Sequence, residues 1–201
     1  MRKAILHLKK SDPVLASVIE RVGPYRIEYR EPVFETLVRS IVYQQLSGRV
    51  AAVIWNRLIG LVPRRRLTPQ AILKLTTEQM RTAGLSGQKV AYIRDLAEHT
   101  KSRRLNFASI ADLPDEGVID HLTKVKGIGV WTAHMFLIFA LRRPDVLPTG
   151  DLGVRLAIQK AYELEELPKP KQIEDLAATW RPYCSVATWY LWRSLDGPAE
   201  L

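Results

Sequence analysis

Two glycines one residue apart, Gly127 and Gly129, stand between two helical patterns of apolar residues. Glycines at this spacing allow a tight reversal of the chain with positive φ. Backbone N–H groups exposed there, at the N-terminus of the second helix, would form a site for a phosphate group. Lys124 and Lys126 place positive charge beside that site. The pattern therefore predicts two helices joined by a tight turn over residues 115–141.

A carboxylate follows this hairpin at Asp151, directly after Pro148-Thr149-Gly150 and before another helical pattern. Asp is a favoured N-cap residue, and carboxylates are favourable at helix N-termini in general. Taken alone, Asp151 is interpreted as a helix cap. A cap would also hold the carboxylate in a fixed direction, so a chemical role for it remains open.

The elements that must position these residues are all expected to be helices. Periods of three and four apolar residues predict helices after Ser11-Asp12-Pro13 and over about 31–43, 50–61, 90–101, 115–122, 130–141, 152–164 and 171–180, with a last one opening at Pro182. The range 31–43 carries the apolar stripe Phe34, Leu37, Val38 and Ile41, and 130–141 is apolar almost all the way round, as in a buried helix. Thr68-Pro69 and Thr76-Thr77-Glu78 start two further short helices by their capping residues. There is no strand-like alternation, internal repeat or low-complexity segment. An all-α fold follows, and 201 residues suffice for one sizeable domain or two small lobes.

The composition of the chain indicates which classes of partner and site to expect. The formal net charge is +9 and the sequence pI is about 9.8, which favours a polyanion, nucleic acid first and an anionic membrane surface second. The one cysteine, Cys184, excludes an intramolecular disulfide and a four-cysteine zinc or iron–sulfur site. Because no apolar run approaches a membrane span and no signal-peptide core follows Met1, we expect an intracellular protein.

The two motifs together resemble one known family. The string Val-Lys-Gly-Ile-Gly-Val-Trp-Thr-Ala at 125–133, followed by Val-Leu-Pro-Thr-Gly-Asp-Leu-Gly-Val at 146–154, is similar to the helix-hairpin-helix (HhH-GPD) DNA glycosylase superfamily, in its 3-methyladenine DNA glycosylase II branch. The resemblance covers roughly residues 30–195. It implies a two-lobed all-α fold with the active-site cleft between the lobes and no N-terminal β-domain. Within one unit, 1–201, residues 45–145 would form a central lobe, with 1–44 and 146–201 forming the second.

The resemblance changes the interpretation of Asp151. Cleavage of an N-glycosidic bond builds positive charge on the sugar, and a carboxylate beside the anomeric carbon would stabilise that charge and orient or deprotonate the attacking water. Family members that also cut the DNA strand use a lysine just after the hairpin, where this chain has Trp131. An indole cannot attack the sugar, so we expect a monofunctional hydrolase of base excision DNA repair that leaves an abasic site.

An alkylated purine is cationic, and an aromatic face would hold it by stacking and cation–π attraction. The family's pattern places the base pocket at Trp131, Met135, Leu152 and Trp192, although Met135 and Leu152 replace aromatic residues there. The residues expected to contact DNA are Gln44, Gln45, Ser47, Leu85, Gly87, Lys124, Lys126, Gly127, Ile128, Gly129 and Thr132. The family's wedge, which fills the gap left by a flipped nucleotide, would fall at Gly87, so Leu85 or a residue near Gln44-Gln45 is expected to substitute.

The expected partner is double-stranded DNA carrying alkylated bases such as 3-methyladenine and 7-methylguanine, bound by a monomer. No cofactor and no iron–sulfur cluster are expected. In the family, a structural Na⁺ or K⁺ is held by hairpin carbonyls, which here would be those of Thr123, Val125 and Ile128.

Two other functions remain open at this point. The chain could be a glycosylase for another damaged base, because several pocket aromatics are replaced. It could also be a non-catalytic module that binds damaged DNA, although an acid at position 151 argues against a surface made only for phosphates.

Overall fold

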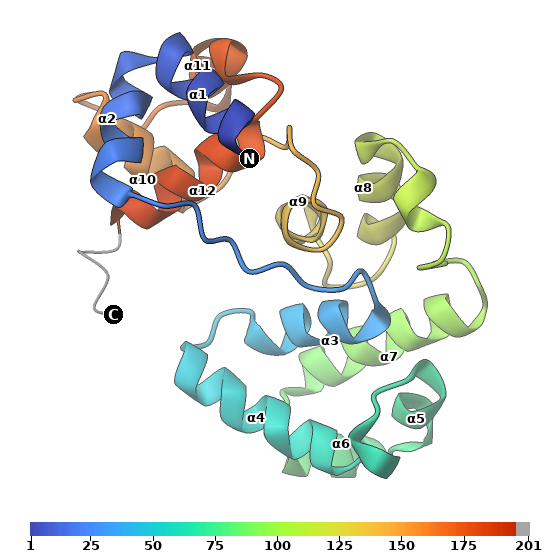
Figure 1. The fold of residues 1–201 in the computed structure, drawn as a ribbon. Helices are drawn as coiled ribbons and strands as arrows, with labels where there is room; N and C mark the ends of the chain where they lie inside the picture. The colour runs from blue at the N-terminus through green and yellow to red at the C-terminus, as the bar shows by residue number, and fades with distance from the viewer. Residues whose placement is uncertain (196–201) are drawn as a thin grey trace. The chain divides into compact units, whose positions relative to one another are not determined.

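A computed structural model describes residues 1–195 of the chain. Helices account for the regular structure of these residues, and no strand occurs among them, so the predicted all-α class is confirmed for this part of the chain (Figure 1). Within the same residues, no helix combines the length and apolarity needed to cross a membrane. The chain divides into two compact units, a terminal unit of residues 1–29 and 137–201 and a central unit of residues 30–136.

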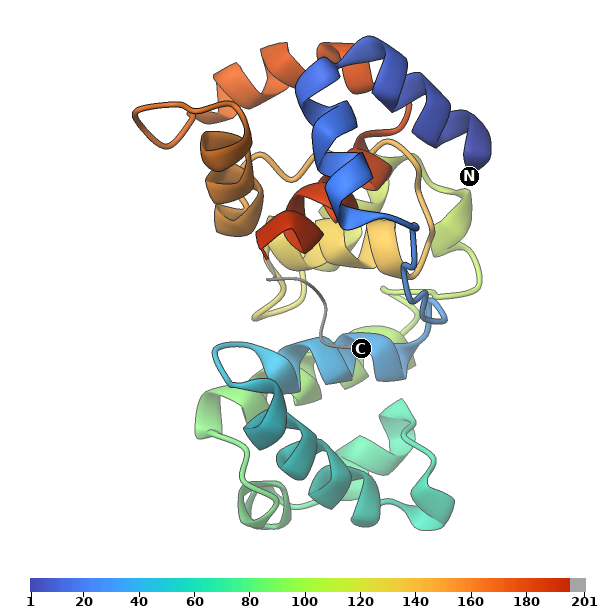
Figure 2. The same ribbon diagram turned by 60° about the vertical axis from the view of Figure 1, so that its left-hand side comes forward.

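The terminal unit is built from both ends of the chain (Figures 1 and 2). Its helices are α1 (Arg2–Ser11), α2 (Pro13–Val22), α10 (Leu152–Ala161), α11 (Pro170–Ala177) and α12 (Cys184–Leu195), with the short η3 (Ala178–Trp180). A buried Asp12 joins three of them. Its Oδ1 caps α2 by accepting from the Leu15 N–H at 2.9 Å, and its Oδ2 accepts from Tyr162 Oη at 2.5 Å and from Trp180 Nε1 at 2.8 Å. This carboxylate therefore fixes α2 against the end of α10.

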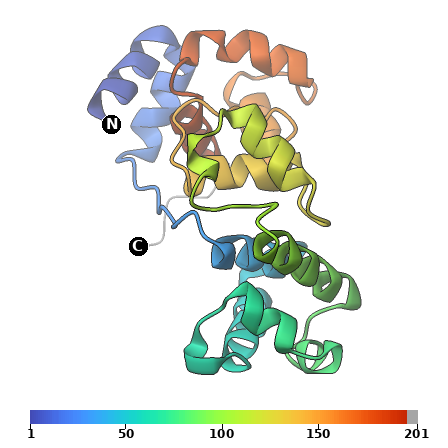
Figure 3. The same cartoon turned by 90° about the vertical axis from the view of Figure 1, so that its right-hand side faces the viewer.

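The central unit carries the hairpin (Figure 3). Its helices are α3 (Phe34–Tyr43), α4 (Gly48–Gly60), α5 (Pro69–Lys74), α6 (Thr77–Thr82), α7 (Gly87–Lys101) and α8 (Asp115–Thr123), with the short η1 (Pro63–Arg65) and η2 (Ile110–Asp112). The stripe predicted for α3, made of Phe34, Leu37, Val38 and Ile41, is buried, and α3 lies beside α4 and α7. Residues 30–44 thus belong to the central unit, which differs from the expected lobe boundary at residue 45.

Helix α9 (Val130–Phe139) contains the point at which the chain passes from the central to the terminal unit. Its residues Ala133, Phe136, Leu137 and Ile138 are all buried, as the continuous apolar run predicts. Helix α1 was not predicted, and its N-cap, Met1, makes no side-chain capping hydrogen bond that could have signalled it.

Candidate active site

The hairpin turn is the six-residue connection between α8 and α9. Its two apolar side chains, Val125 and Ile128, are buried, and the Ile128 N–H donates to the Val125 carbonyl at 3.1 Å. Gly127 adopts φ +80°, in the left-handed region, and a Cβ built on it would lie 2.1 Å from Cδ2 of Tyr92. Only glycine satisfies both conditions. At Gly129, a Cβ would meet nothing within 4 Å, so packing does not require that glycine.

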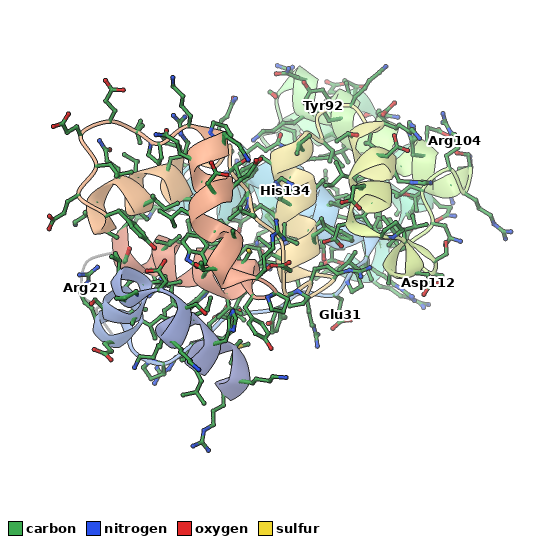
Figure 4. All side chains as sticks on the ribbon, turned by 90° about the horizontal axis from the view of Figure 1, so that it is seen from above. Arg21, Glu31, Tyr92, Arg104, Asp112 and His134 are labelled. Carbon is green, nitrogen blue, oxygen red and sulfur yellow. The ribbon has the colours of Figure 1, made fainter. Side chains whose placement is uncertain are left out.

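One face of α7 supports this turn. Lys89, Tyr92 and Asp95 follow one another at intervals of three residues and so share a face of the helix. The Asp95 Oδ2 accepts from the Lys126 N–H at 2.9 Å, and the Tyr92 ring lies under Gly127. Figure 4 labels Tyr92, which lies toward the hairpin end of α9, and His134 farther along that helix. We call these three side chains the α7 support.

Lys89 connects the α7 support to the end of α3. Its Nζ donates to the carbonyl oxygens of Val42 and Gln44, at 2.7 and 2.8 Å, and its partial burial lowers the pKa of the amine. The Gln44 side chain in turn donates from Nε2 to the Gly127 carbonyl at 3.0 Å. The hairpin turn is therefore held from α3 as well as from α7.

Asp151 is the N-cap of α10 and is 8% exposed. Its Oδ1 accepts two hydrogen bonds, from the Val154 N–H at 2.7 Å and from Trp192 Nε1 at 2.8 Å. The Trp192 ring stacks on Phe139, with centroids 5.8 Å apart and planes at 15°. A Cβ on Gly153 would lie 3.1 Å from both Asp151 Oδ1 and Trp192 Cδ1, so the absence of a side chain there permits the close approach of indole and carboxylate.

The central unit contains a pocket of about 430 Å³. It is lined by Trp131, Thr132 and Met135 from α9, by Arg30, by Thr36, Arg39, Ser40 and Tyr43 from α3, and by Gln44 and Gln45 after it. The Trp131 side chain is 51% exposed. Arg39 is stacked on Tyr43, with Cζ 4.0 Å from the ring centroid, and its Nη2 donates to the Tyr43 hydroxyl at 2.9 Å. The pocket thus combines the half-exposed indole of Trp131 with the guanidinium of Arg39, whose orientation is restricted by Tyr43.

The residues predicted for the base pocket fall into two groups. Trp131 and Met135 line the pocket of the central unit, whereas Trp192 and Leu152 accompany Asp151 in the terminal unit. Leu152, the first residue of α10, is 57% exposed. Trp192 has a role that the sequence did not reveal, because its indole N–H donates to the Asp151 carboxylate.

The residues predicted to contact DNA differ in accessibility. Gln45, Ser47, Gly87, Lys124, Lys126 and Gly129 are exposed. Ser47 caps α4, and Lys124 Nζ pairs with Asp120 at 2.6 Å, which lowers the pKa of that carboxyl mainly through the hydrogen bond. The side chains of Leu85, Ile128 and Thr132 are buried, so only their backbone atoms are available to a partner.

Leu85 shows the clearest departure from expectation, because 3% of its surface is exposed and it packs in the core. A wedge at that position would have to leave the core. Gln45, by contrast, is exposed and adopts φ +56°, which turns the chain sharply after α3. Among residues 1–195, no group of three or more His, Cys, Asp or Glu could hold a metal ion.

Sequence reasoning missed Arg39, Tyr43, Phe139, Gly153 and the α7 support. Two signals were available. Arg39 and Tyr43 are four residues apart on a predicted helix, and Phe139 continues the spacing of four from Trp131 and Met135. The α7 support has no such signal, since its partners are backbone groups of distant segments.

Comparison with known proteins agrees with this geometry. A model of the HhH-GPD superfamily base excision DNA repair proteins matches residues 38–182. DNA-3-methyladenine glycosylase 1 of Schizosaccharomyces pombe is 34% identical over 200 residues, covering 96% of this chain and 87% of its own. The solved structure of that organism's 3-methyladenine DNA glycosylase (Mag1) with abasic DNA gives a TM-score of 0.84 at 34% identity, over 94% of this chain and 95% of its own. A DNA-3-methyladenine glycosidase from Bacillus halodurans gives 0.87 at 36% identity, over 96% and 89%.

Proposed function

The chain belongs to the HhH-GPD superfamily of base excision DNA repair proteins, and on this premise we propose that it is a monofunctional DNA glycosylase acting on alkylated purines. It removes bases such as 3-methyladenine and 7-methylguanine and leaves an abasic site. The observation that carries the proposal is the buried Asp151 carboxylate, which receives the N–H of Trp192 and the N–H of Val154 on one oxygen. A carboxylate held in this way has a fixed direction, as catalysis requires.

The reaction breaks the bond from C1′ of the sugar to N9 of the purine, and the bonding electrons leave with the base. Because alkylation makes the base cationic, the electrons neutralise it and no general acid is needed. Positive charge accumulates on the sugar, and Asp151 stabilises it electrostatically. Water then adds to C1′, and Asp151 accepts the proton that the water loses. The products are the free neutral base and an abasic sugar.

The reaction ends there because no amine is supplied at the position after the hairpin turn. Trp131 occupies that position, and a Schiff base with C1′ requires a primary amine. Lys124 and Lys126 precede the turn, and Lys124 pairs with Asp120. DNA-strand breaks are therefore expected only after alkaline treatment of the abasic product.

The central unit supplies most of the DNA affinity. It carries sixteen Lys and Arg against nine Asp and Glu, a net charge of +7 of the chain's +9. The hairpin turn binds a backbone phosphate through its N–H groups, with Lys124 and Lys126 beside it, and this contact reads no sequence. Gly87 and Ser47, both exposed and each at the start of a helix, are further proposed contacts.

Gln45 is the proposed wedge. It is exposed at a left-handed position, whereas the neighbouring Gln44 is bonded to the Gly127 carbonyl and the alternative Leu85 is buried. Insertion of a side chain into the base stack offsets part of the stacking lost when the damaged nucleotide flips out.

A monovalent cation would bind at the hairpin through the carbonyls of Thr123, Val125 and Ile128. These are hard oxygen donors, which suit Na⁺ or K⁺, and the Val125 carbonyl already accepts from the Ile128 N–H. Such an ion would supply positive charge at the hairpin, where the backbone phosphate is proposed to bind. The chemistry at Asp151 has no step that uses it.

Release of bases from DNA methylated with a labelled methyl donor tests the proposal. Free 3-methyladenine or 7-methylguanine, with strand breaks only after alkali, is the expected result. Asp151→Asn should abolish release while DNA affinity remains. Tight, salt-sensitive binding by the wild type without any released base would contradict the proposal and favour a binding module.

A further inference from the structure

The pocket of the central unit contains a charged group that the chemistry at Asp151 does not use. The Arg39 guanidinium is half-buried, stacked on the Tyr43 ring and bonded to the Tyr43 hydroxyl. The stack and the hydrogen bond together restrict its orientation. A guanidinium fixed before a ligand arrives loses little entropy on forming hydrogen bonds, which suits it for recognition.

Most of the donors of this guanidinium remain available. Arginine has five N–H donors, and within residues 1–195 the only hydrogen bond recorded for Arg39 is the one to Tyr43. The side chain lines the same pocket as Trp131, which is 51% exposed. A ligand in this pocket would therefore meet a stacking surface and a set of hydrogen-bond donors.

The lining identifies the kind of ligand. Trp131, Met135 and Tyr43 give the pocket broad apolar and aromatic surfaces, which a base can stack on and a phosphate cannot. Because Arg39 can only donate, the edge of that base facing it must carry an acceptor. Position 6 of a purine distinguishes the two bases, because the carbonyl oxygen of guanine accepts a hydrogen bond and the amino group of adenine donates one.

We propose that Arg39 is a specificity-determining residue that donates to the carbonyl oxygen of a flipped 6-oxopurine stacked on Trp131. The preference that follows is for alkylated guanines over alkylated adenines. The inference rests on the proposed function, since it concerns which alkylated purine the same enzyme removes.

Two common alkylated bases allow the effect of the Arg39 hydrogen bond to be measured. The nucleotides of 7-methylguanine and 3-methyladenine are both cationic, so the repulsion between the base and Arg39 is similar for the two. They differ at position 6, where guanine presents an oxygen and adenine presents an amino group, and also at position 2 and in the site of methylation. The differences away from position 6 are the same for every variant, so the change in the ratio of released bases on substitution of Arg39 reports the hydrogen bond rather than the charge.

One substrate measures this ratio directly. Methylated duplex DNA contains both lesions, and chromatography separates the released bases from a single reaction. Because both bases come from the same protein and DNA, differences in folding, concentration and DNA affinity cancel. Arg39→Met removes the donors and keeps a long side chain, and it should lower the ratio of 7-methylguanine to 3-methyladenine by about tenfold or more, the effect typical of a hydrogen bond to a charged group. Arg57→Met, at an exposed position of α4, is the matched control and should leave the ratio unchanged.

Tyr43→Phe gives an independent measurement. It removes the hydroxyl that fixes Arg39 but keeps the ring beneath the guanidinium. The ratio should fall in the same direction by about two- to fivefold, less than for Arg39→Met, because the donors remain and the ring still restricts the guanidinium. This milder variant decides the matter if Arg39→Met does not fold.

The outcomes are distinguishable. A parallel fall in both bases, or an unchanged ratio in the two variants, would overturn the role of Arg39 while the proposed function stands. If the wild type releases neither base, the proposed function fails, and the specificity of Arg39 fails with it.

Discussion

Removal of one N–H group tests how Asp151 is positioned. Trp192→Phe deletes the indole N–H that donates to Asp151 Oδ1 at 2.8 Å and keeps an aromatic ring for the stack on Phe139. The cap bond from the Val154 N–H remains, so α10 keeps its N-terminus. The substitution therefore changes the direction of the carboxylate and leaves the surrounding fold in place.

The size of the effect follows from the kind of bond lost. A hydrogen bond to a charged group contributes about 1.5–3 kcal/mol. If that energy holds the carboxylate in its reactive direction, its loss slows the chemical step by about 10- to 100-fold, since roughly 1.4 kcal/mol corresponds to a factor of ten. The dissociation constant for DNA should stay unchanged, because Trp192 donates to a carboxylate and not to a phosphate.

Single-turnover base release, with enzyme in excess over methylated DNA, measures the chemical step, and a salt titration measures DNA affinity separately. Trp189→Phe is the matched control. It removes an indole from the same helix, where the ring packs on Tyr25 with centroids 4.6 Å apart and is buried in the core. That control should lower the melting temperature and leave the single-turnover rate near the wild-type value.

Trp192 was predicted from the sequence as a stacking surface for the base, and the same experiment separates the two roles. Full activity in Trp192→Phe together with loss in Trp192→Leu would refute positioning through the N–H and support stacking. Gly153→Ala provides a second approach, because the added Cβ lies 3.1 Å from both Asp151 Oδ1 and Trp192 Cδ1. It should slow release in parallel with Trp192→Phe.

Three further results are expected. Gly127→Ala should lower the free energy of unfolding by about 2 kcal/mol or more in urea, because Gly127 has a left-handed backbone and an added Cβ would clash with Tyr92. Gly129→Ala, the control, should change it by no more than about 0.5 kcal/mol, since a Cβ there meets nothing. Equal effects of the two substitutions would contradict the packing argument. Lys89→Met should weaken DNA binding without altering the released-base ratio, because it removes the donor that holds the carbonyls of Val42 and Gln44, and the Gln44 side chain in turn holds the Gly127 carbonyl of the hairpin turn. Unchanged affinity would show that Lys89 does not support the turn. Binding of undamaged duplex should fall steeply with salt in the wild type, and a flat dependence would exclude phosphate contacts as the main source of affinity.

The helices were largely predictable because apolar periodicity records burial. The stripe of α3 is buried as predicted, and the expected caps at Asp12, Thr68 and Thr76 all accept their backbone N–H groups. The apolar run of α9 is buried from Ala133 onward at four positions, whereas Val130 and Trp131 at its start are each 51% exposed, contrary to the expectation of a helix buried all round. The hairpin was predictable for a similar reason, since a tight reversal leaves a glycine signature. These signals are local, because each lies within a short continuous stretch of the sequence.

The contacts that organise the site were not predictable in this way. Asp151 and Trp192 are 41 residues apart, and Gln44 and Gly127 are 83 apart. Neither residue type nor spacing reveals such a pair. For Leu85 the sequence led to a wrong expectation, because a leucine beside a turn looks the same in the sequence whether it is exposed, as a wedge must be, or buried. Its burial depends on tertiary packing, which one sequence does not disclose.

Asp151 shows why the structural and chemical interpretations of one residue need not compete. As an N-cap it satisfies a backbone donor of α10, and the same bond fixes one carboxylate oxygen. Asparagine is an equally favoured N-cap, so Asp151→Asn should keep the helix and lose only the negative charge. If Asp151 were a cap alone, that variant would behave as the wild type in every assay. A protein that unfolds at the wild-type temperature, binds DNA and releases no base would establish that the charge itself is required.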